Sequence, residues 1–297
     1  MVKIALMKQN ELETVSKFIS KLNNNEESHI GFCGKDSEEI AEYIKEEIPY
    51  TECFVVAYDV EKLVGVIGYD PDCDSSVAEI WGPYLLEEHW KTVNLMWERL
   101  MDTLPKKINA VHMFPNKENK KACELATNNN FTKLSDQAIL VFNRNDSQLL
   151  PDVHMKELTP DYYSDMEKLH DETFPGTYYN GKQIIERLNE NNKVFIVTEN
   201  EELCGYIYVE ADLEYGESSI EFFGVEKSKR GKGIGGQLLT GALKWLFSFD
   251  VTESIILVVD SESENAINLY KKVGFQLRHD LHYFKKMIRE VVSSLVK

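Results

Sequence analysis

A glycine-rich turn between a strand and a helix constrains this chain more than any other segment. It follows a strand-like run at 219–225 and precedes an amphipathic, helix-like run at 237–249. A strand end, a loop without side-chain bulk and a new helix N-terminus present unpaired backbone N–H groups to one point. Gly233 and Gly235 adopt positive φ readily and leave room for phosphate oxygens, so the turn predicts a diphosphate-binding cradle. Its residues are Arg230, Gly231, Lys232, Gly233, Ile234, Gly235 and Gly236.

Two other phosphate-binding glycine loops do not fit this turn. The dinucleotide fingerprint G-x-G-x-x-G has a different spacing from the glycines at 231, 233 and 235. The loop of nucleotide hydrolases needs a glycine followed by Lys and Ser or Thr, and the chain has none at that distance. The pattern that remains is R-x-x-G-x-G. Taken alone, it leaves open an ordinary strand-to-helix turn with spare glycines.

A second motif follows downstream. Residues 254–260 read as a buried strand, and residues 265–275 read as a short helix that Gly274 ends. The combination of R-x-x-G-x-G with N-x-x-x-L-Y-x-K-x-G-F resembles the two signature motifs of the GNAT superfamily, the acetyl-CoA-dependent N-acetyltransferases. The resemblance implies acetyl-CoA as co-substrate, with its pyrophosphate on the cradle. It also implies that Asn265 hydrogen-bonds the coenzyme and that the backbone of Phe223, Gly224 and Val225 pairs with the pantetheine arm.

The resemblance also suggests catalytic residues. The Tyr270 hydroxyl would face the thioester sulfur and protonate the leaving thiolate, the alternative being a tyrosine that only packs in its helix. Backbone amides near residues 223–225 would polarise the thioester carbonyl. Strand alternation places Glu221 on the same face as Phe223, which makes it the candidate base for the ammonium, directly or through water. An exposed strand carboxylate explains Glu221 equally well, and Glu217 is a weaker candidate.

The loop at 174–181 is the candidate substrate lid, because glycine, proline and aromatic residues together give a shaped and mobile segment. Phe174, Tyr178 and Tyr179 are the expected substrate-binding residues, since tyrosine rings attract a cationic amine. The open alternative is that they cover the core. Five scattered cysteines without C-x-x-C spacing predict neither disulfides nor a metal site.

The first half reads as a second copy of the same fold. Residues 63–67 parallel residues 203–207 at an offset of 140, and residues 122–125 parallel residues 266–269 at an offset of 144. In the first copy no glycine follows Gly82 before the next helix-like run at 87–104, and Lys121 stands where the second copy has Asn265. This copy is therefore expected to lack the cradle. An unrelated α+β domain remains the alternative.

These features predict an α/β (α+β) fold with two GNAT-like domains, each a largely antiparallel mixed sheet flanked by helices. The polar segment at 143–151 divides a degenerate domain, 1–146, from a catalytic domain, 152–297. The amphipathic pattern at 287–297 predicts a terminal helix. The net charge of −17 argues against nucleic acid as a partner and fits a cationic substrate, but it fits an ordinary soluble cytoplasmic protein as well.

The predicted function is acetyl transfer from acetyl-CoA to a primary amine of a small, cationic substrate by direct attack in a ternary complex, because no His-paired cysteine offers an acyl-accepting nucleophile. The alternative is a non-catalytic acyl-CoA sensor or partner-docking module. The chain lacks a signal-peptide pattern and a membrane-length apolar run, so a cytoplasmic protein without membrane partners is expected, as monomer or homodimer.

Overall fold

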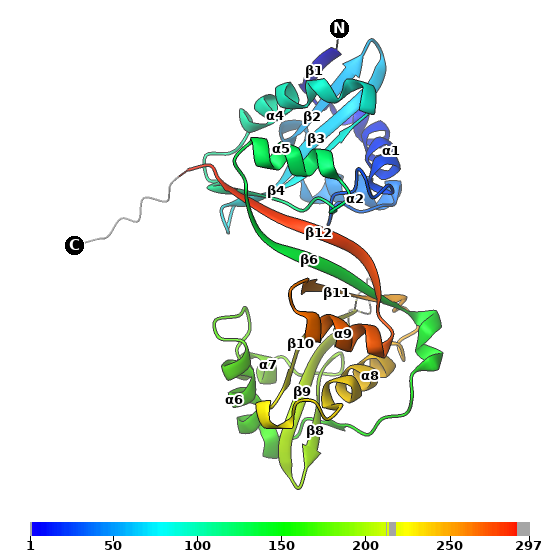
Figure 1. The fold of residues 1–297 in the computed structure, drawn as a ribbon, viewed down its shortest axis with the longest axis vertical. Coiled ribbons are helices and arrows are strands. Elements are labelled where there is room, and N and C mark those ends of the chain that lie inside the picture. Colours follow the sequence, from blue (N-terminus) through cyan, green and yellow to red (C-terminus); the bar gives the residue numbers. More distant parts are fainter. Residues whose placement is uncertain (1, 212, 214–217, 290–297) are drawn as a thin grey trace, which may run out of the picture. The chain divides into compact units, whose positions relative to one another are not determined.

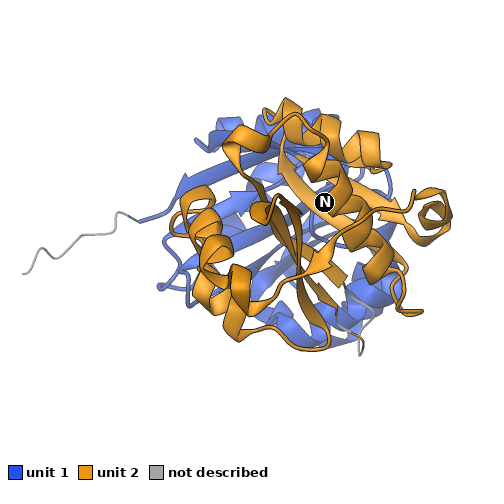
Figure 2. Ribbon diagram, turned by 90° about the horizontal axis from the view of Figure 1, so that it is seen from below, with its two compact units in different colours: residues 1–137, 279–297 blue, residues 138–278 orange. Residues whose placement is uncertain are grey.

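The computed structural model describes residues 2–211, 213 and 218–289 (Figure 1). It has two compact units, one formed by Met1–Gln137 with His279–Lys297 and the other by Ala138–Arg278 (Figure 2). Among the described helices, none is long and apolar enough to cross a membrane.

The two halves of the chain repeat one succession of elements. The first half contains β1 (Val2–Leu6), α1 (Leu12–Asn23), α2 (Ser37–Glu47), a short α3 (Tyr50–Cys53), β2 (Phe54–Asp59), β3 (Lys62–Asp72), β4 (Val77–Leu85), α4 (Val93–Met101), β5 (Ala110–Met113), α5 (Lys120–Asn128) and β6 (Thr132–Asn143). The second half contains β7 (Lys156–Glu157), α6 (Tyr163–Thr173), α7 (Gly181–Glu186), β8 (Asn192–Glu199), β9 (Glu202–Ala211), β10 (Ser218–Val225), α8 (Ile234–Leu246), β11 (Ser254–Asp260), α9 (Glu264–Val273) and β12 (Gln276–Met287). Apart from α3 and short 3-10 turns, the order is the same, and the predicted mixed α/β class is confirmed.

Unit 1 is built on the strand order β1-β2-β3-β4-β5-β12. The pairs are antiparallel except β4 with β5, which are parallel. Helix α1 contacts β3 and β4, and α4 contacts β2 and β3. Their apolar stripes supply core residues such as Ile19 and Leu100, both without solvent exposure. The sheet and these helices therefore enclose a core of their own.

The last strand of each repeat begins in its own unit and continues into the other. Strand β12 closes the second repeat in sequence, yet its residues from His279 onward lie in unit 1, where Phe284 pairs with Met113 and Met287 pairs with Ala110. Residues 138–143 of β6 lie in unit 2, where β6 neighbours β11 in the strand order. The predicted continuous domains 1–146 and 152–297 thus differ from the observed units, because β5 pairs with β12.

Unit 2 contains the four-stranded antiparallel sheet β10-β9-β8-β7 with a separate core on each face. Helices α8 and α9 cover one core, which includes Leu238 and Phe275. Helices α6 and α7 cover the other, which includes Met166 and Ile184. Strands β10 and β11 contact each other, but β10 ends this sheet and β11 ends the other strand order. Two adjacent strands therefore lie in different sheets at this point.

Three predicted elements differ from the structure. The helix expected at 237–249 begins earlier, at Ile234, inside the glycine run. The helix expected at 87–104 is a 3-10 helix, η2 (Glu87–Thr92), followed by α4, which ends at Met101. The terminal helix expected at 287–297 is wrong at its start, because Met287 ends β12. Its residues 290–297 and the candidate Glu217 lie outside the described residues.

Candidate active site

The glycine turn forms an amide cradle at the N-terminus of α8. Gly233 is the N-cap residue with φ of 84°, and Gly231 has φ of 78°. A Cβ at either position would meet no atom within 4 Å, so both glycines border open space. Gln237 is the first amide of α8 to bond back, to the Gly233 carbonyl at 3.0 Å, so the amides of Ile234, Gly235 and Gly236 have no partner within the helix. The arrangement suits an anion.

Gly235 has a different role from the one its sequence context predicted. It lies within the first turn of α8 and does not have positive φ. A Cβ there would lie 3.0 Å from Leu269 Cδ2 on α9 and 3.7 Å from Phe223 Cε2 on β10. Gly235 therefore lets α8 approach α9 and β10 closely. Arg230 holds the start of the cradle, because its Nε donates to the Val225 carbonyl at 3.0 Å.

A cavity of about 460 Å³ opens where β10 and β11 separate. That volume falls in the range of small-molecule sites. Glu221 is the one charged residue among those that line it. The lining residues are Phe174, Tyr178, Ser219, Ile220, Glu221, Phe222, Phe223, Ile256, Leu257, Val258, Ala266 and Tyr270. The structure thus brings five predicted site residues, from a loop, a strand and a helix, to one cavity.

Tyr270 is nearly buried in this wall. Its side chain is 8% exposed, and its ring stands edge-on to Phe223 at 5.9 Å and to Phe275 at 5.5 Å between centroids. Burial raises the pKa of the Tyr270 phenol to about 12. The hydroxyl consequently keeps its proton at neutral pH and can act as a donor toward the cavity.

Glu221 lies at an irregularity in β10. Ile220 pairs with Val209 and Phe222 with Tyr208, so Glu221 is the extra residue of a bulge. The Tyr178 hydroxyl donates to Glu221 Oε2 from the loop between α6 and α7. Burial raises the pKa of Tyr178, and the bond to Glu221 raises it further, so Tyr178 stays a donor. Loop and strand therefore meet at a carboxylate with one hydroxyl already bound to it.

Tyr179, the neighbouring aromatic, is engaged within the protein. The guanidinium of Arg187 lies 4.2 Å from the centroid of its ring, and the same guanidinium donates to Glu210 Oε1 at 3.0 Å. The cation that this ring attracts is therefore one of the chain's own. No spacing pattern in the sequence links the residues of this cluster, because Arg187 follows α7 and Glu210 lies near the end of β9.

Asn265 lies apart from the cavity. It is an exposed residue in the first turn of α9 and lines none of the cavities described for unit 2. A second hollow of about 510 Å³ adjoins the cradle, with Gly233, Gly236 and Gln237 in its wall. Within the described residues, no group of three or more His, Cys, Asp or Glu side chains is placed to hold a metal ion.

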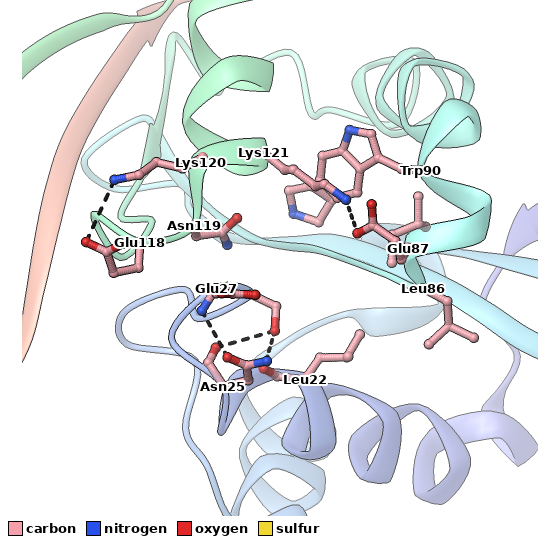
Figure 3. Close-up of a pocket in the computed structure, with 13 residues that line it drawn as sticks. Leu22, Asn25, Glu27, Leu86, Glu87, Trp90, Glu118, Asn119, Lys120 and Lys121 are labelled. Atoms are coloured by element: carbon pink, nitrogen blue, oxygen red, sulfur yellow. Dashed lines mark hydrogen bonds and ion pairs between the residues drawn. The ribbon is translucent and has the colours of Figure 1, made fainter.

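Unit 1 has a different arrangement after its equivalent strand, β4. The chain continues through Leu86 into η2, beside a cavity of about 420 Å³ (Figure 3). The Lys121 ammonium pairs with the Glu87 carboxylate and lies 5.3 Å from the Trp90 ring centroid (Figure 3). Carboxylates and bulky side chains stand where unit 2 has glycines and free amides.

Comparison with known proteins identifies the fold. Residues 156–275 match the model of the acetyltransferase (GNAT) family. A GCN5-related N-acetyltransferase from Sphaerobacter thermophilus superposes with a TM-score of 0.67 at 14% identity, over 97% of this chain and 96% of that one. A tandem GNAT protein from the clavulanic acid biosynthesis pathway gives 0.58 at 10% identity, over 98% and 99%. A putative acetyltransferase from Pyrococcus horikoshii gives 0.52 at 12% identity, over 97% and 90%.

No curated protein matches the sequence. At these identities the solved structures show the fold alone, and they show it over nearly the whole chain. The chain therefore resembles the GNAT superfamily in a tandem arrangement, and the family's sequence pattern lies in the second repeat.

Proposed function

We propose that the second repeat is an N-acetyltransferase that moves an acetyl group from acetyl-CoA to the primary amine of a small, cationic substrate by direct attack in a ternary complex. One observation carries the proposal: the amide cradle and the Glu221–Tyr270 cavity adjoin at Phe223. This side chain lines the cavity and lies beside Gly235 at the start of α8. A group held on the amides and extending past Phe223 would reach the carboxylate and the phenol.

The residues fit coenzyme A in two ways. The cradle offers the first-turn amides of α8, which have no partner within the helix, and open space for a pyrophosphate, with Arg230 and Lys232 adding positive charge. Strand β10 is the last strand of its sheet in the described chain and does not pair with the adjacent β11, so where the two border the cavity its edge can pair with an extended arm such as pantetheine. Asn265 as a further ligand of the coenzyme remains a proposal from the motif alone.

The coenzyme would supply an activated acetyl thioester, and side chains of the protein would accept and donate the protons that move in the reaction. Glu221 accepts a proton from the substrate ammonium, directly or through water, and leaves a neutral amine for attack. As the C–N bond forms and the C–S bond breaks, Tyr270 would donate its proton to the departing sulfur, because its raised pKa keeps the phenol protonated until that moment. The second proton that the nitrogen loses on becoming an amide would restore the phenol. Amides of β10 near residues 223–225 are proposed to stabilise the charge on the carbonyl oxygen.

A cationic substrate is favoured by the charge of the site. Glu221 is the charged residue of the cavity lining, and Tyr178 and Phe222 add aromatic surface beside it, with their ring centroids 4.8 Å apart. A small amine in the cytoplasm is the expected partner, without nucleic acid or membrane, and the chain is expected to act as monomer or homodimer.

A non-catalytic acyl-CoA sensor is the second candidate, and free-thiol release separates the two. The assay combines acetyl-CoA with a panel of a polyamine, an aminoglycoside and a lysine peptide, and mass spectrometry identifies the product. Amine-dependent thiol release supports the enzyme. Binding of acetyl-CoA without release from any amine favours the sensor.

Replacing Glu221 tests the acceptor side. Glu221→Gln is expected to lower kcat/KM for the amine by about a hundredfold, the lower end for a lost general base, with acetyl-CoA affinity unchanged. Glu190→Gln, an exposed carboxylate in the turn before β8, is the matched control. Steady-state kinetics with both substrates varied gives the result. Wild-type kcat/KM in Glu221→Gln would remove this carboxylate from the mechanism.

The difference between the repeats predicts one coenzyme per chain. Acetyl-CoA should titrate to a stoichiometry of one in calorimetry, because η2 carries carboxylates where α8 offers free amides. Trp90→Phe and Lys121→Gln should leave that affinity unchanged. Two equivalent sites per chain would show that unit 1 also holds the coenzyme.

A further inference from the structure

A buried histidine in unit 2 joins three elements around the acceptor side of the cavity. His170 lies in the last turn of α6 with no solvent exposure. Its Nε2 is 2.8 Å from the Tyr179 carbonyl oxygen, and its Nδ1 is 2.6 Å from the Tyr206 hydroxyl oxygen on β9. Its ring also stands edge-on to Phe222 on β10, at 4.9 Å between centroids. Both ring nitrogens are therefore in use.

These partners fix the tautomer of His170. A carbonyl oxygen only accepts, so Nε2 must carry the hydrogen that bonds to Tyr179. In the neutral ring Nδ1 then accepts from the Tyr206 hydroxyl, which keeps its proton because burial raises the pKa of Tyr206. The contacts hold the ring in one orientation.

The bond to Tyr179 anchors one end of the substrate loop. Tyr179 directly follows Tyr178, whose hydroxyl donates to Glu221. Two residues after Tyr179, the Gly181 amide donates to Asp171 Oδ1 at 2.8 Å. The adjacent α6 residues His170 and Asp171 therefore hold this end of the loop at Tyr179 and at Gly181. The tip of the loop contrasts with this end, because Gly176 has φ of 76° and open space around it. Tyr178 is thus carried on the anchored side of the loop.

We propose that His170 is a positioning residue for the acceptor amine. By fixing the Tyr179 carbonyl, it keeps Tyr178 over Glu221 and sets where the carboxylate presents itself to the substrate ammonium. His170 lies behind Phe222 and acts through the loop backbone rather than by touching the substrate. This inference rests on the proposed function, since Glu221 and Tyr178 define the amine site.

The test compares two substitutions of one residue. His170→Phe removes the donor to the Tyr179 carbonyl, whereas His170→Gln keeps an N–H that reaches the same oxygen. KM for the amine is expected to rise about tenfold in His170→Phe, the effect of one lost hydrogen bond, and to recover largely in His170→Gln. The affinity for acetyl-CoA should be the same in both. An unchanged KM in His170→Phe would overturn the proposal.

A second readout needs no activity. Hydrogen exchange of the amides at 177–181 should speed up about tenfold in His170→Phe and much less in His170→Gln. If no amine supports thiol release, the proposed function fails while the exchange data still decide whether His170 anchors the loop. Should His170→Phe not fold, Asp171→Ala loosens the same loop end from an exposed position, and exchange at wild-type rates in that variant would overturn the anchoring.

Discussion

Gly233→Asp is expected to abolish acetyl-CoA binding while the protein stays folded. The new carboxylate would lie at the N-cap of α8, among the free amides that we assign to the pyrophosphate, and would both occupy and repel the anion site. The φ of 84° disfavours any side chain, but a Cβ here meets no neighbour within 4 Å, so the substitution costs backbone strain of about 1–2 kcal/mol rather than a clash.

Gly233→Asn separates charge from strain. Asparagine has nearly the same shape, tolerates left-handed backbone and carries no charge. Calorimetric affinity should fall far more in the aspartate variant than in the asparagine variant, and both should melt at similar temperatures. Wild-type affinity in Gly233→Asp would disprove the assignment of the cradle.

Tyr270→Phe is expected to lower kcat about a hundredfold or more with little change in acetyl-CoA affinity. The phenol hydroxyl would act in the transition state, as the acid for the leaving thiolate, so its removal affects turnover rather than binding. The ring contacts with Phe223 and Phe275 remain in the variant, which keeps the wall of the cavity intact.

A packing role for Tyr270 makes the opposite forecast. If Tyr270 only packs, Tyr270→Phe would lower the melting temperature of the protein and leave kcat unchanged. Both kcat and the melting temperature are therefore measured for the variant. Tyr283→Phe in unit 1 serves as the control for removing a partly buried hydroxyl elsewhere. Near-wild-type kcat in Tyr270→Phe under saturating amine would assign the proton to water or to the amine itself.

Sequence reasoning succeeded where the physics is local. A glycine turn at a helix start, a C-terminal glycine such as Gly274, and the strand at 254–260 depend on neighbours within a few residues, and the structure has these elements in place. The prediction that this strand is buried was wrong, because β11 ends its strand order and Ile256 and Val258 are exposed. Local sequence patterns also selected Glu221, Tyr178 and Tyr270 as candidate site residues. That all three line one cavity depends on the tertiary fold.

Contacts between segments far apart in the sequence could not be predicted from local patterns. His170 gains its role from Tyr179 and Tyr206, and the ring of Tyr179 lies against Arg187, which no spacing rule links. The pairing of β12 with β5 is equally non-local, since an apolar strand pattern states that a strand has partners but not which ones. The predicted domain boundary therefore followed the polar linker rather than the strand order.

The exchange of last strands between the units affects folding during synthesis. During synthesis the N-terminal part of a protein usually folds first. Here, however, β5 can pair with β12 only after residues 276–287 have been translated. Until then an unpaired strand edge of unit 1 is exposed to other nascent chains. Proteolytic or genetic cleavage after β6, in the segment 144–151 that contains a 3-10 helix, would likewise separate each fragment from a strand of its own unit. Such fragments should recover structure by reassociating rather than by folding separately.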